Sequence, residues 1–180
     1  MPRTFAFLRA INVGGHTVPM ARLKSLFEGF GLRRVETFIA SGNVAFEAEG
    51  EGEAALAARI EAGLEAALGY EVAVFLRSER AFLALAGACP FAAEEVAAAS
   101  ALSVAFLAAP LTRDQAARLQ ALATEVDAFR AAGREVWWLC RVRQSESRFS
   151  NALFERALKV RATFRGFNTL QRWAAKHSNP

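Results

Sequence analysis

The pattern of hydrophobic and polar positions changes along the chain, from the two-residue period of strands to the three- or four-residue period of helices and back. Residues 4–10 are mostly apolar, with Phe5 and Phe7 on one side of the pleat, which is typical of a strand with a buried face. A helix is predicted between Pro19 and Gly31, because apolar residues recur there every three or four positions and proline suits the first helical turn. The chain therefore begins with a strand followed by a helix.

The next elements complete a four-stranded unit. Two strands are predicted at 35–40 and 44–48, and the Ser-Gly-Asn turn between them favours a β-hairpin because glycine and asparagine tolerate positive φ. A second helix is predicted over 53–68 from its spaced apolar residues and its alanines, and a strand over 71–77 closes the unit. The order is βαββαβ.

The same order returns after a helical connector that runs from about 79 to 99 and is interrupted near Pro90. The predicted elements are a strand at 102–108, a helix at 112–123, a hairpin of 125–131 and 134–140, a helix at 150–159, a short strand at 162–165 and a last helix at 168–176. Thr112 and Ser150 are expected to cap the helices that begin at these positions. We therefore expect an α+β protein with two ferredoxin-like (βαββαβ) subdomains and antiparallel sheets, the alpha-beta plait. The predicted boundaries are 1–78 for the N-terminal subdomain, 79–100 for the connector, and 101–180 for the C-terminal subdomain with its terminal helix.

Composition indicates the cellular compartment. The chain has 180 residues and is 53% hydrophobic, which is enough to fill a core. Cys89 and Cys140 are far apart and have no CxxC partner, which argues against a disulfide framework or a zinc site and suits a reducing compartment. Arg9 interrupts the only apolar run of the N-terminal segment, unlike a signal peptide, and no apolar stretch reaches the ~20 residues that span a bilayer. We expect a cytoplasmic protein.

The net charge of +4 is unevenly distributed. Up to residue 109 the chain has 9 basic and 12 acidic residues, whereas from 110 onward it has 13 basic and 6 acidic residues. Between Arg141 and Lys176, nine basic residues face only Glu146 and Glu155. Such a segment is consistent with an anionic partner or with an ordinary solvated helix face.

The loop between the first strand and the first helix is a candidate ligand site. A strand end that leads into a helix presents unpaired N–H groups and the positive end of the helix dipole, and Gly14 and Gly15 let an anion approach closely. The motif is neither GxxxxGK(S/T) nor GxGxxG, and Pro19 removes one donor. The alternative is that the glycines only turn the chain while Asn12 bonds the loop backbone.

In a ferredoxin-like sheet the loop after strand one lies beside the start of strand three, so 12–15 should lie close to 41–43. With Arg9 nearby, these loops could bind a phosphate or a carboxylate, or equally could hold each other by hydrogen bonds. A comparable polar cluster is expected in the second subdomain. The candidate ligand-binding residues are Arg9, Asn12, Gly14, Gly15, Ser41, Gly42, Asn43, Ser150, Asn151, Arg165 and Asn168.

Catalytic chemistry has little support in the sequence. His16 and His177 are the only histidines and form no triad pattern, although His16 could act as an acid or base from its loop. The glutamates between 47 and 53 lack metal-ligand spacing, so neither a metal nor a cofactor is predicted. The sequence assigns no enzymatic activity and no oligomeric state.

RNA binding is the main rival interpretation, since ferredoxin-like sheets can stack bases on aromatic residues of their central strands. Phe5, Phe7 and Phe46 are on suitable strands, but the basic-Gly-aromatic pattern is missing, and core packing explains them more simply. Trp137 and Trp138 point to opposite faces of one strand, so one of them is expected to be exposed, where an assembly interface could use it.

Four segments of the chain resemble a known family. They are FLRAINVGG, PMARLKSLFEGFG, TFIASGNVAFE and SRFSNALFERALKVRATFRGFNTLQRWA. In this order they are similar to the pattern of DUF1697, a widespread bacterial group defined by a domain of unknown function. The resemblance covers nearly the whole chain and implies a pair of ferredoxin-like subdomains, but no activity. Ala10 stands where the family usually has glycine, and Phe164, Gly166 and Phe167 replace a more polar run.

The expected function is therefore the binding of a small anionic or phosphate-bearing ligand, a nucleotide included, by a cytoplasmic bacterial protein that does not enter membranes. One alternative is a nucleic-acid-binding protein that uses the basic C-terminal half. The other is a structural or assembly protein.

Overall fold

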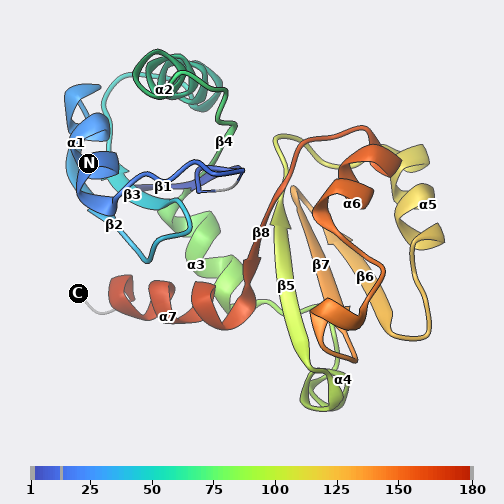
Figure 1. Ribbon diagram of the computed structural model, residues 1–180. Helices are drawn as coiled ribbons and strands as arrows, with labels where there is room; N and C mark the ends of the chain where they lie inside the picture. Colours follow the sequence, from blue (N-terminus) through green and yellow to red (C-terminus); the bar gives the residue numbers. More distant parts are fainter. Residues whose placement is uncertain (1–2, 13, 179–180) are drawn as a thin grey trace. The chain divides into compact units, whose positions relative to one another are not determined.

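The computed structural model describes residues 3–12 and 14–178, so Val13 of the predicted glycine loop lies outside the described residues. The chain divides into two compact units, Met1–Leu83 and Ala84–Pro180. Each unit has its own four-stranded antiparallel sheet with flanking helices (Figure 1). The two ferredoxin-like subdomains are confirmed, while the assignment of 79–100 to a separate connector stays a prediction.

The N-terminal unit has the predicted βαββαβ order. Its elements are β1 (Arg3–Leu8), α1 (Met20–Gly29), β2 (Arg33–Thr37), β3 (Asn43–Glu47), α2 (Glu53–Leu68) and β4 (Val74–Ser78), and α3 (Glu79–Gly87) follows directly. The sheet order is β2-β3-β1-β4, and all neighbours are antiparallel. Apolar residues of α1 and α2, such as Phe27 and Ile60, pack with Leu8 and Phe46 into one buried cluster. The helix stripes predicted from the sequence form this core.

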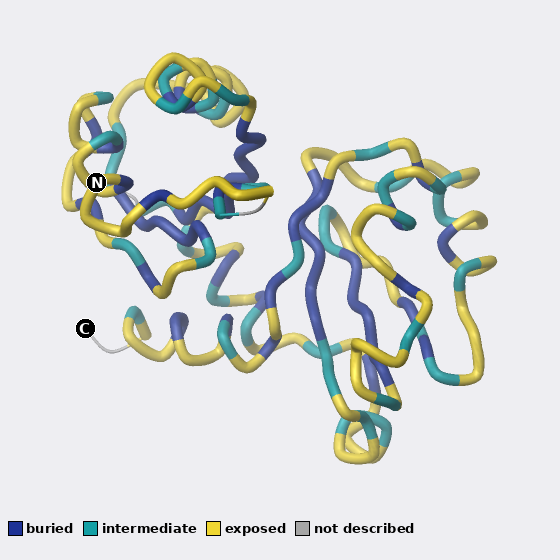
Figure 2. Tube along the Cα trace, in the orientation of Figure 1, coloured by how far each residue is buried: buried dark blue, intermediate teal, exposed yellow. Residues whose placement is uncertain are grey.

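The opposite face of the N-terminal sheet is also buried (Figure 2). Phe5 and Phe7 have no exposed surface, and Phe5 stacks on Phe82 of α3 with the ring centroids 4.3 Å apart. Phe46 is equally buried on the helix-covered face. The core interpretation of these three phenylalanines is confirmed, and none of their rings is free to stack on a base.

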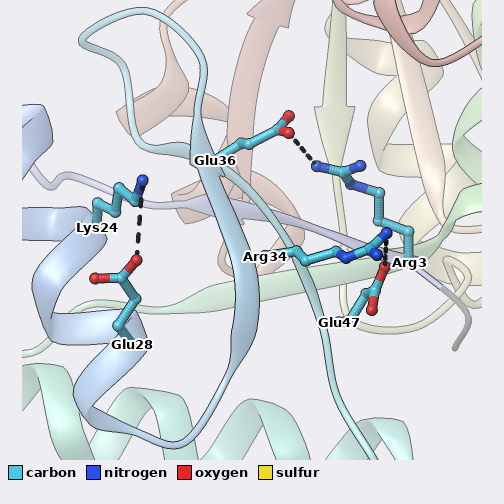
Figure 3. Close-up of polar contacts among 6 residues, drawn as sticks. All are labelled: Arg3, Lys24, Glu28, Arg34, Glu36 and Glu47. Atoms are coloured by element: carbon cyan, nitrogen blue, oxygen red, sulfur yellow. Dashed lines mark hydrogen bonds and ion pairs between the residues drawn. The ribbon is translucent and has the colours of Figure 1, made fainter.

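The edge strand β2 has a bulge and forms ion pairs with other strands of the sheet. Arg34 contacts Glu47 of β3 at 3.5 Å, and Arg3 of β1 contacts Glu36 at 2.7 Å (Figure 3). The pairing register shifts between Arg33 and Glu36, and Arg34 has a φ of +47°. A bulged, charged edge resists pairing with the strands of another chain. We therefore infer a structural role for these residues.

The C-terminal unit repeats the plan with different side chains. Its elements are α4 (Ala93–Ala98), β5 (Ala101–Phe106), α5 (Arg113–Ala121), β6 (Asp127–Ala132), β7 (Glu135–Cys140), the short 3₁₀ helix η1 (Gln144–Glu146), α6 (Asn151–Leu158), β8 (Thr163–Gly166) and α7 (Phe167–His177). The sheet order β6-β7-β5-β8 matches that of the first unit. Leu119 of α5 and Phe154 of α6 belong to one buried cluster with Trp138 on one face of this sheet.

The expectation that one of the two adjacent tryptophans is exposed is wrong. Trp137 is 1% exposed and Trp138 is 7% exposed. Trp138 lies on the face that α5 and α6 cover, whereas Trp137 lies on the other face, edge-on to Phe167 of α7 at a centroid distance of 5.0 Å. Because α7 also packs on β5 and β8, both faces of the sheet are covered. Within residues 3–12 and 14–178, none of the helices has the length and apolarity needed to cross a membrane.

Candidate functional site

Three connections meet at one end of the N-terminal sheet. Since β1 is antiparallel to both β3 and β4, the chain leaves β1 at the end where it enters the other two strands. The connections are 9–19, 38–42 and 69–73, and together they form the N-terminal loop cluster. Backbone hydrogen bonds already tie them, from Leu8 N to Gly42 O at 2.8 Å and from Arg9 N to Ala73 O at 2.9 Å.

Asn12 joins two of these connections through its side-chain amide. Its Nδ2 donates to the carbonyl oxygen of Ala40 at 2.5 Å, and its Oδ1 accepts from the backbone N–H of Val18 at 2.7 Å. A neutral amide can donate and accept at once, which lets one residue close its own loop and bind a second loop. The predicted proximity of the two loops is confirmed, and the side chain of Asn12 serves to hold them together.

The residues of the 41–43 turn shape it from within. Asn43 is 1% exposed, and its Nδ2 donates to the carbonyl oxygen of Phe38 at 3.0 Å and to Ser41 Oγ at 2.9 Å. Gly42 has a φ of +77°, and a Cβ placed on it would lie 2.7 Å from Ile11 Cγ2. Only glycine satisfies both the backbone angle and the close approach. A ligand-binding role for these three residues stays a prediction.

Gly14 and Gly15 form the exposed tip of the cluster. Their φ values of +63° and +83° match the two central positions of a type I′ turn, and a Cβ on either would meet nothing within 4 Å. The nearby N-terminus of α1 has Pro19 at its cap position, no side-chain cap and no acidic residue in its first turn. Its first N–H groups are therefore left to solvent or to a ligand.

Two residues of the cluster without the freedom of glycine adopt a left-handed backbone. Ala10 has a φ of +60° and Ile39 a φ of +50°. Such a conformation costs on the order of 1–3 kcal/mol, and it is most unusual for a β-branched residue such as isoleucine. At Ala10 a glycine would adopt this angle without strain. Backbone strain of this kind is a reason to look for function.

An aromatic pair supports the same loop. The hydroxyl of Tyr70 donates to the carbonyl oxygen of Ile11 at 3.0 Å, and the ring of His16 stacks on the ring of Tyr70 with centroids 3.8 Å apart and an interplanar angle of 21°. Tyr70 is not among the residues predicted from the sequence. Its partner lies 59 positions away, so no local pattern could have revealed the contact; its being the single tyrosine of the chain was the only signal.

The candidate residues of the C-terminal unit have separate partners. Ser150 caps α6, because its Oγ accepts from the N–H of Leu153 at 3.1 Å, and Asn151 donates to the carbonyl oxygen of Ala162 at 3.4 Å. Asn168 is exposed in the first turn of α7. Ser150 is thus confirmed as a helix cap, whereas a ligand-binding role for this set stays a prediction.

Arg165, the remaining candidate, is buried in β8. Its Nη1 donates to Thr163 Oγ1 at 2.6 Å and to the carbonyl oxygen of Phe164 at 2.9 Å. Burial lowers the pKa of Arg165 from its ordinary value to about 10. Only 7% of its surface is exposed, and a ligand-binding role for Arg165 stays a prediction.

A second polar cluster surrounds Asp127, at the start of β6. Its carboxylate accepts from Trp138 Nε1 at 2.8 Å, from Thr124 Oγ1 at 3.0 Å, and from Ser147 Oγ at 2.8 and 2.9 Å to its two oxygens. Asp127 also lines a surface cavity of about 330 Å³ together with Glu125, Glu146 and Arg148, among others. The donors already satisfy the buried carboxylate, and the acidic lining disfavours an anion.

Metal chemistry has no assembled ligand set in the part of the chain that the structure describes, where no three His, Cys, Asp or Glu residues converge on a point. The N-terminal loop cluster is therefore the candidate site with accessible N–H groups, an exposed imidazole and unusual backbone.

The chain is similar to a known protein family and to a solved structure. A family model described as "Protein of unknown function (DUF1697)" matches residues 1–137. A solved structure, the conserved bacterial protein SP0830 from Streptococcus pneumoniae, is similar with a TM-score of 0.73 at 25% sequence identity, over 96% of this chain and 98% of that one. No curated protein matches the chain in sequence. The matched range of the family model includes the whole N-terminal loop cluster and ends before the C-terminal motif.

Proposed function

We propose that the N-terminal loop cluster of this chain binds a small anionic, phosphate-bearing ligand. The chain belongs to the DUF1697 family, which is described as a family of unknown function, so the proposal is argued from the structure. The anion would lie against the backbone N–H groups of Gly14 and Gly15 and the uncapped start of α1. Backbone N–H groups and the positive end of a helix dipole are the groups that proteins commonly use to hold phosphate.

The observation that carries the proposal is the contrast between the same end of the two units. Eleven residues, 9–19, connect β1 to α1, whereas six, 107–112, connect β5 to α5. Five residues, 38–42, join β2 to β3, whereas two, 133–134, join β6 to β7. The fold needs only the shorter connections, so the additional chain of the N-terminal unit requires another explanation.

The two units also differ in how the N-terminus of their first helix is capped. In the C-terminal unit, Thr112 Oγ1 accepts from Gln115 N at 3.2 Å, and Gln115 Oε1 accepts from Thr112 N at 2.9 Å, so the start of α5 is closed by its own side chains. The start of α1 has no such cap. An anion would supply the missing acceptors.

Thermal unfolding with inorganic phosphate, pyrophosphate and a panel of nucleotides tests the proposal. A ligand at ten times its Kd stabilises the folded state by about 1.4 kcal/mol, which raises the Tm of a chain of this size by roughly 3–6 °C. If no phosphate-bearing compound changes the Tm at millimolar concentration, the proposal fails.

Substitution of Gly15 gives a matched pair of variants. Gly15→Asp places a carboxylate where the anion is expected and should abolish the ligand-dependent rise in Tm. Gly15→Asn has nearly the same shape without the charge, and asparagine tolerates positive φ as aspartate does, so it should keep most of the rise. Equal loss in both variants would indicate a steric effect and would count against an anion at this position.

Nucleic-acid binding by the C-terminal unit is the second candidate, supported by its exposed basic side chains. They include Arg141, Arg143, Arg148, Arg156 and Lys159. Because Arg165 is buried, the exposed pair Arg156 and Lys159 is the better target for charge removal. The double variant Arg156→Ala, Lys159→Ala should weaken oligonucleotide binding and reduce its salt dependence by about two charges. Absence of binding at low salt would exclude this function.

A further inference from the structure

The stacked pair of His16 and Tyr70 has one side left to solvent. Tyr70 is half-buried and fixed by its hydrogen bond to Ile11, while His16 is exposed and covers the Tyr70 ring at 3.8 Å. One face of the imidazole therefore rests on a ring that cannot easily move, and the other face is accessible. A supported, exposed aromatic ring is the type of surface on which proteins stack nucleic acid bases and other planar groups.

Apolar side chains are also exposed at this end of the unit. Among the described residues, the exposed large hydrophobic side chains are Met20, 42% exposed, and Ile39, 39% exposed. Met20 follows the 9–19 connection directly, and Ile39 lies in the 38–42 turn. One of these side chains thus lies in the N-terminal loop cluster, on a left-handed backbone, and the other directly follows the cluster. Apolar surface of this kind suits the non-ionic part of a ligand.

We infer that the ligand of the N-terminal loop cluster carries a planar ring as well as its anionic group, and that this ring stacks on the solvent-facing side of His16. The ring-binding role rests on the proposed function for the anionic half of the ligand. A nucleoside monophosphate is the chemical class that joins the two parts. His16 directly follows Gly15, and consecutive Cα atoms are about 3.8 Å apart, so a ribose-sized spacer can connect a phosphate at the tip with a base on the imidazole.

The two histidines of the chain make the stacking directly observable. In proton NMR spectra we expect AMP to move the imidazole Hε1 resonance of His16 upfield in a saturable manner, because a purine stacked on the ring shields it. The resonance of His177, in the C-terminal unit, should not move and serves as the internal control. Inorganic phosphate should bind without producing the upfield shift.

Affinity measurements by calorimetry complement the spectra. His16→Ala should weaken AMP binding by about tenfold, the size of one base-aromatic stacking contact, and should leave the affinity for inorganic phosphate unchanged. His16→Phe restores a ring and should recover most of the AMP affinity. His177→Ala is the matched control and should bind AMP as the wild type does. Since His16 is exposed, neither of its substitutions should affect folding.

The outcomes separate the ring-binding role from the proposed function. If phosphate and AMP bind equally tightly and His16→Ala changes neither, the ring-binding role is overturned while the anion site stands. If adenosine binds and shifts His16 as AMP does, but phosphate does not bind, stacking is supported and the anion site fails. If phosphate, adenosine and AMP all fail to bind, both are overturned.

Discussion

The two units share one fold but differ in the loops at one end of their sheets. Both have the same order of elements and the same sheet order, but their connections differ at the end where the first helix begins. In the C-terminal unit the connections are short, and the capping residues Thr112 and Gln115 satisfy the helix start. In the N-terminal unit the connections are long and strained, and they leave the helix start uncapped. Repetition within one chain thus provides an internal reference for what the scaffold itself requires.

The units also differ in the polar group that anchors their loops. The N-terminal unit uses the neutral amides of Asn12 and Asn43, whereas the C-terminal unit uses the carboxylate of Asp127. An amide can pair with a carbonyl oxygen and an N–H together, but a carboxylate only accepts. Accordingly, the carboxylate of Asp127 accepts from the indole N–H of Trp138 and from the hydroxyls of Thr124 and Ser147.

The largest effect is expected when the charged anchor is removed. Asp127→Ala leaves the indole N–H of Trp138 and two hydroxyls without their acceptor and should lower the free energy of unfolding by about 3–4 kcal/mol. In the N-terminal unit, Asn43→Ala removes a side-chain amide that donates to two acceptors and should cost about 1–2 kcal/mol. Urea unfolding measures both. Equal losses would show that the two anchors have the same energetic weight and would remove this part of the contrast.

The hairpin glycines provide the second comparison. Gly42→Ala combines a φ of +77° with a methyl group 2.7 Å from Ile11 Cγ2 and should destabilise the protein by about 2–3 kcal/mol. Gly133→Ala has a φ of +58° but its nearest atom, Glu135 Oε2, is 3.6 Å away, so only the backbone term of about 1 kcal/mol applies. Thermal melts of the two variants give the difference, and a similar loss in both would show that the loop contact at Gly42 relaxes without cost.

The N-termini of α1 and α5 provide the third comparison. Thr112→Ala removes the cap of α5 and should cost about 1 kcal/mol. Pro19→Asp supplies α1 with the side-chain cap and the negative charge that it lacks, which should stabilise the helix by up to about 1 kcal/mol and at the same time weaken phosphate binding. Melting curves with and without phosphate test both effects. An unchanged phosphate response in Pro19→Asp would indicate that the anion does not use the start of α1.

The last effect appears only above pH 9 and concerns the C-terminal unit, which contains both cysteines. Burial raises the pKa of the Cys140 thiol above its ordinary value of 9.0, and the carboxylates of Asp127 and Glu146 add to the rise. Below pH 9 the thiol is neutral in both states. Above it the unfolded chain releases the proton while the folded chain keeps it, so stability falls by at most about 1.4 kcal/mol per pH unit.

Urea midpoints between pH 8 and pH 10 measure this loss. Cys140→Ala should remove the thiol's share of the decline, and Cys89→Ala should retain it. If the decline is the same in Cys140→Ala as in the wild type, the Cys140 thiol does not contribute to it.

Local signals predicted most of the scaffold. The helix over 53–68 has the predicted bounds, and Thr112 and Ser150 cap their helices as expected, because a cap depends on residues three positions apart. The exposure of one tryptophan was predicted wrongly for a long-range reason. Alternation places side chains on two faces of a strand, but it does not say that a terminal helix such as α7 will cover the second face.

The candidate site was predicted only in part, for the same reason. That the loops around Asn12 and Ser41 meet follows from the strand order, so the topology was sufficient to foresee it. That Asn12 uses both ends of its amide, that Tyr70 supports His16 and that Ile39 adopts positive φ depend on contacts between distant segments. Such contacts leave no periodic signal in the sequence.

The hydrogen bond from Val18 to Asn12 makes the exchange of one amide proton a measure of the opening of the whole cluster. The N–H of Val18 donates to the side-chain oxygen of Asn12, so its proton can exchange with solvent deuterium only when this hydrogen bond breaks. Its exchange rate therefore measures how long the two loops remain joined, and a bound ligand that bridges them would slow that one proton before it slows the protons of the sheet.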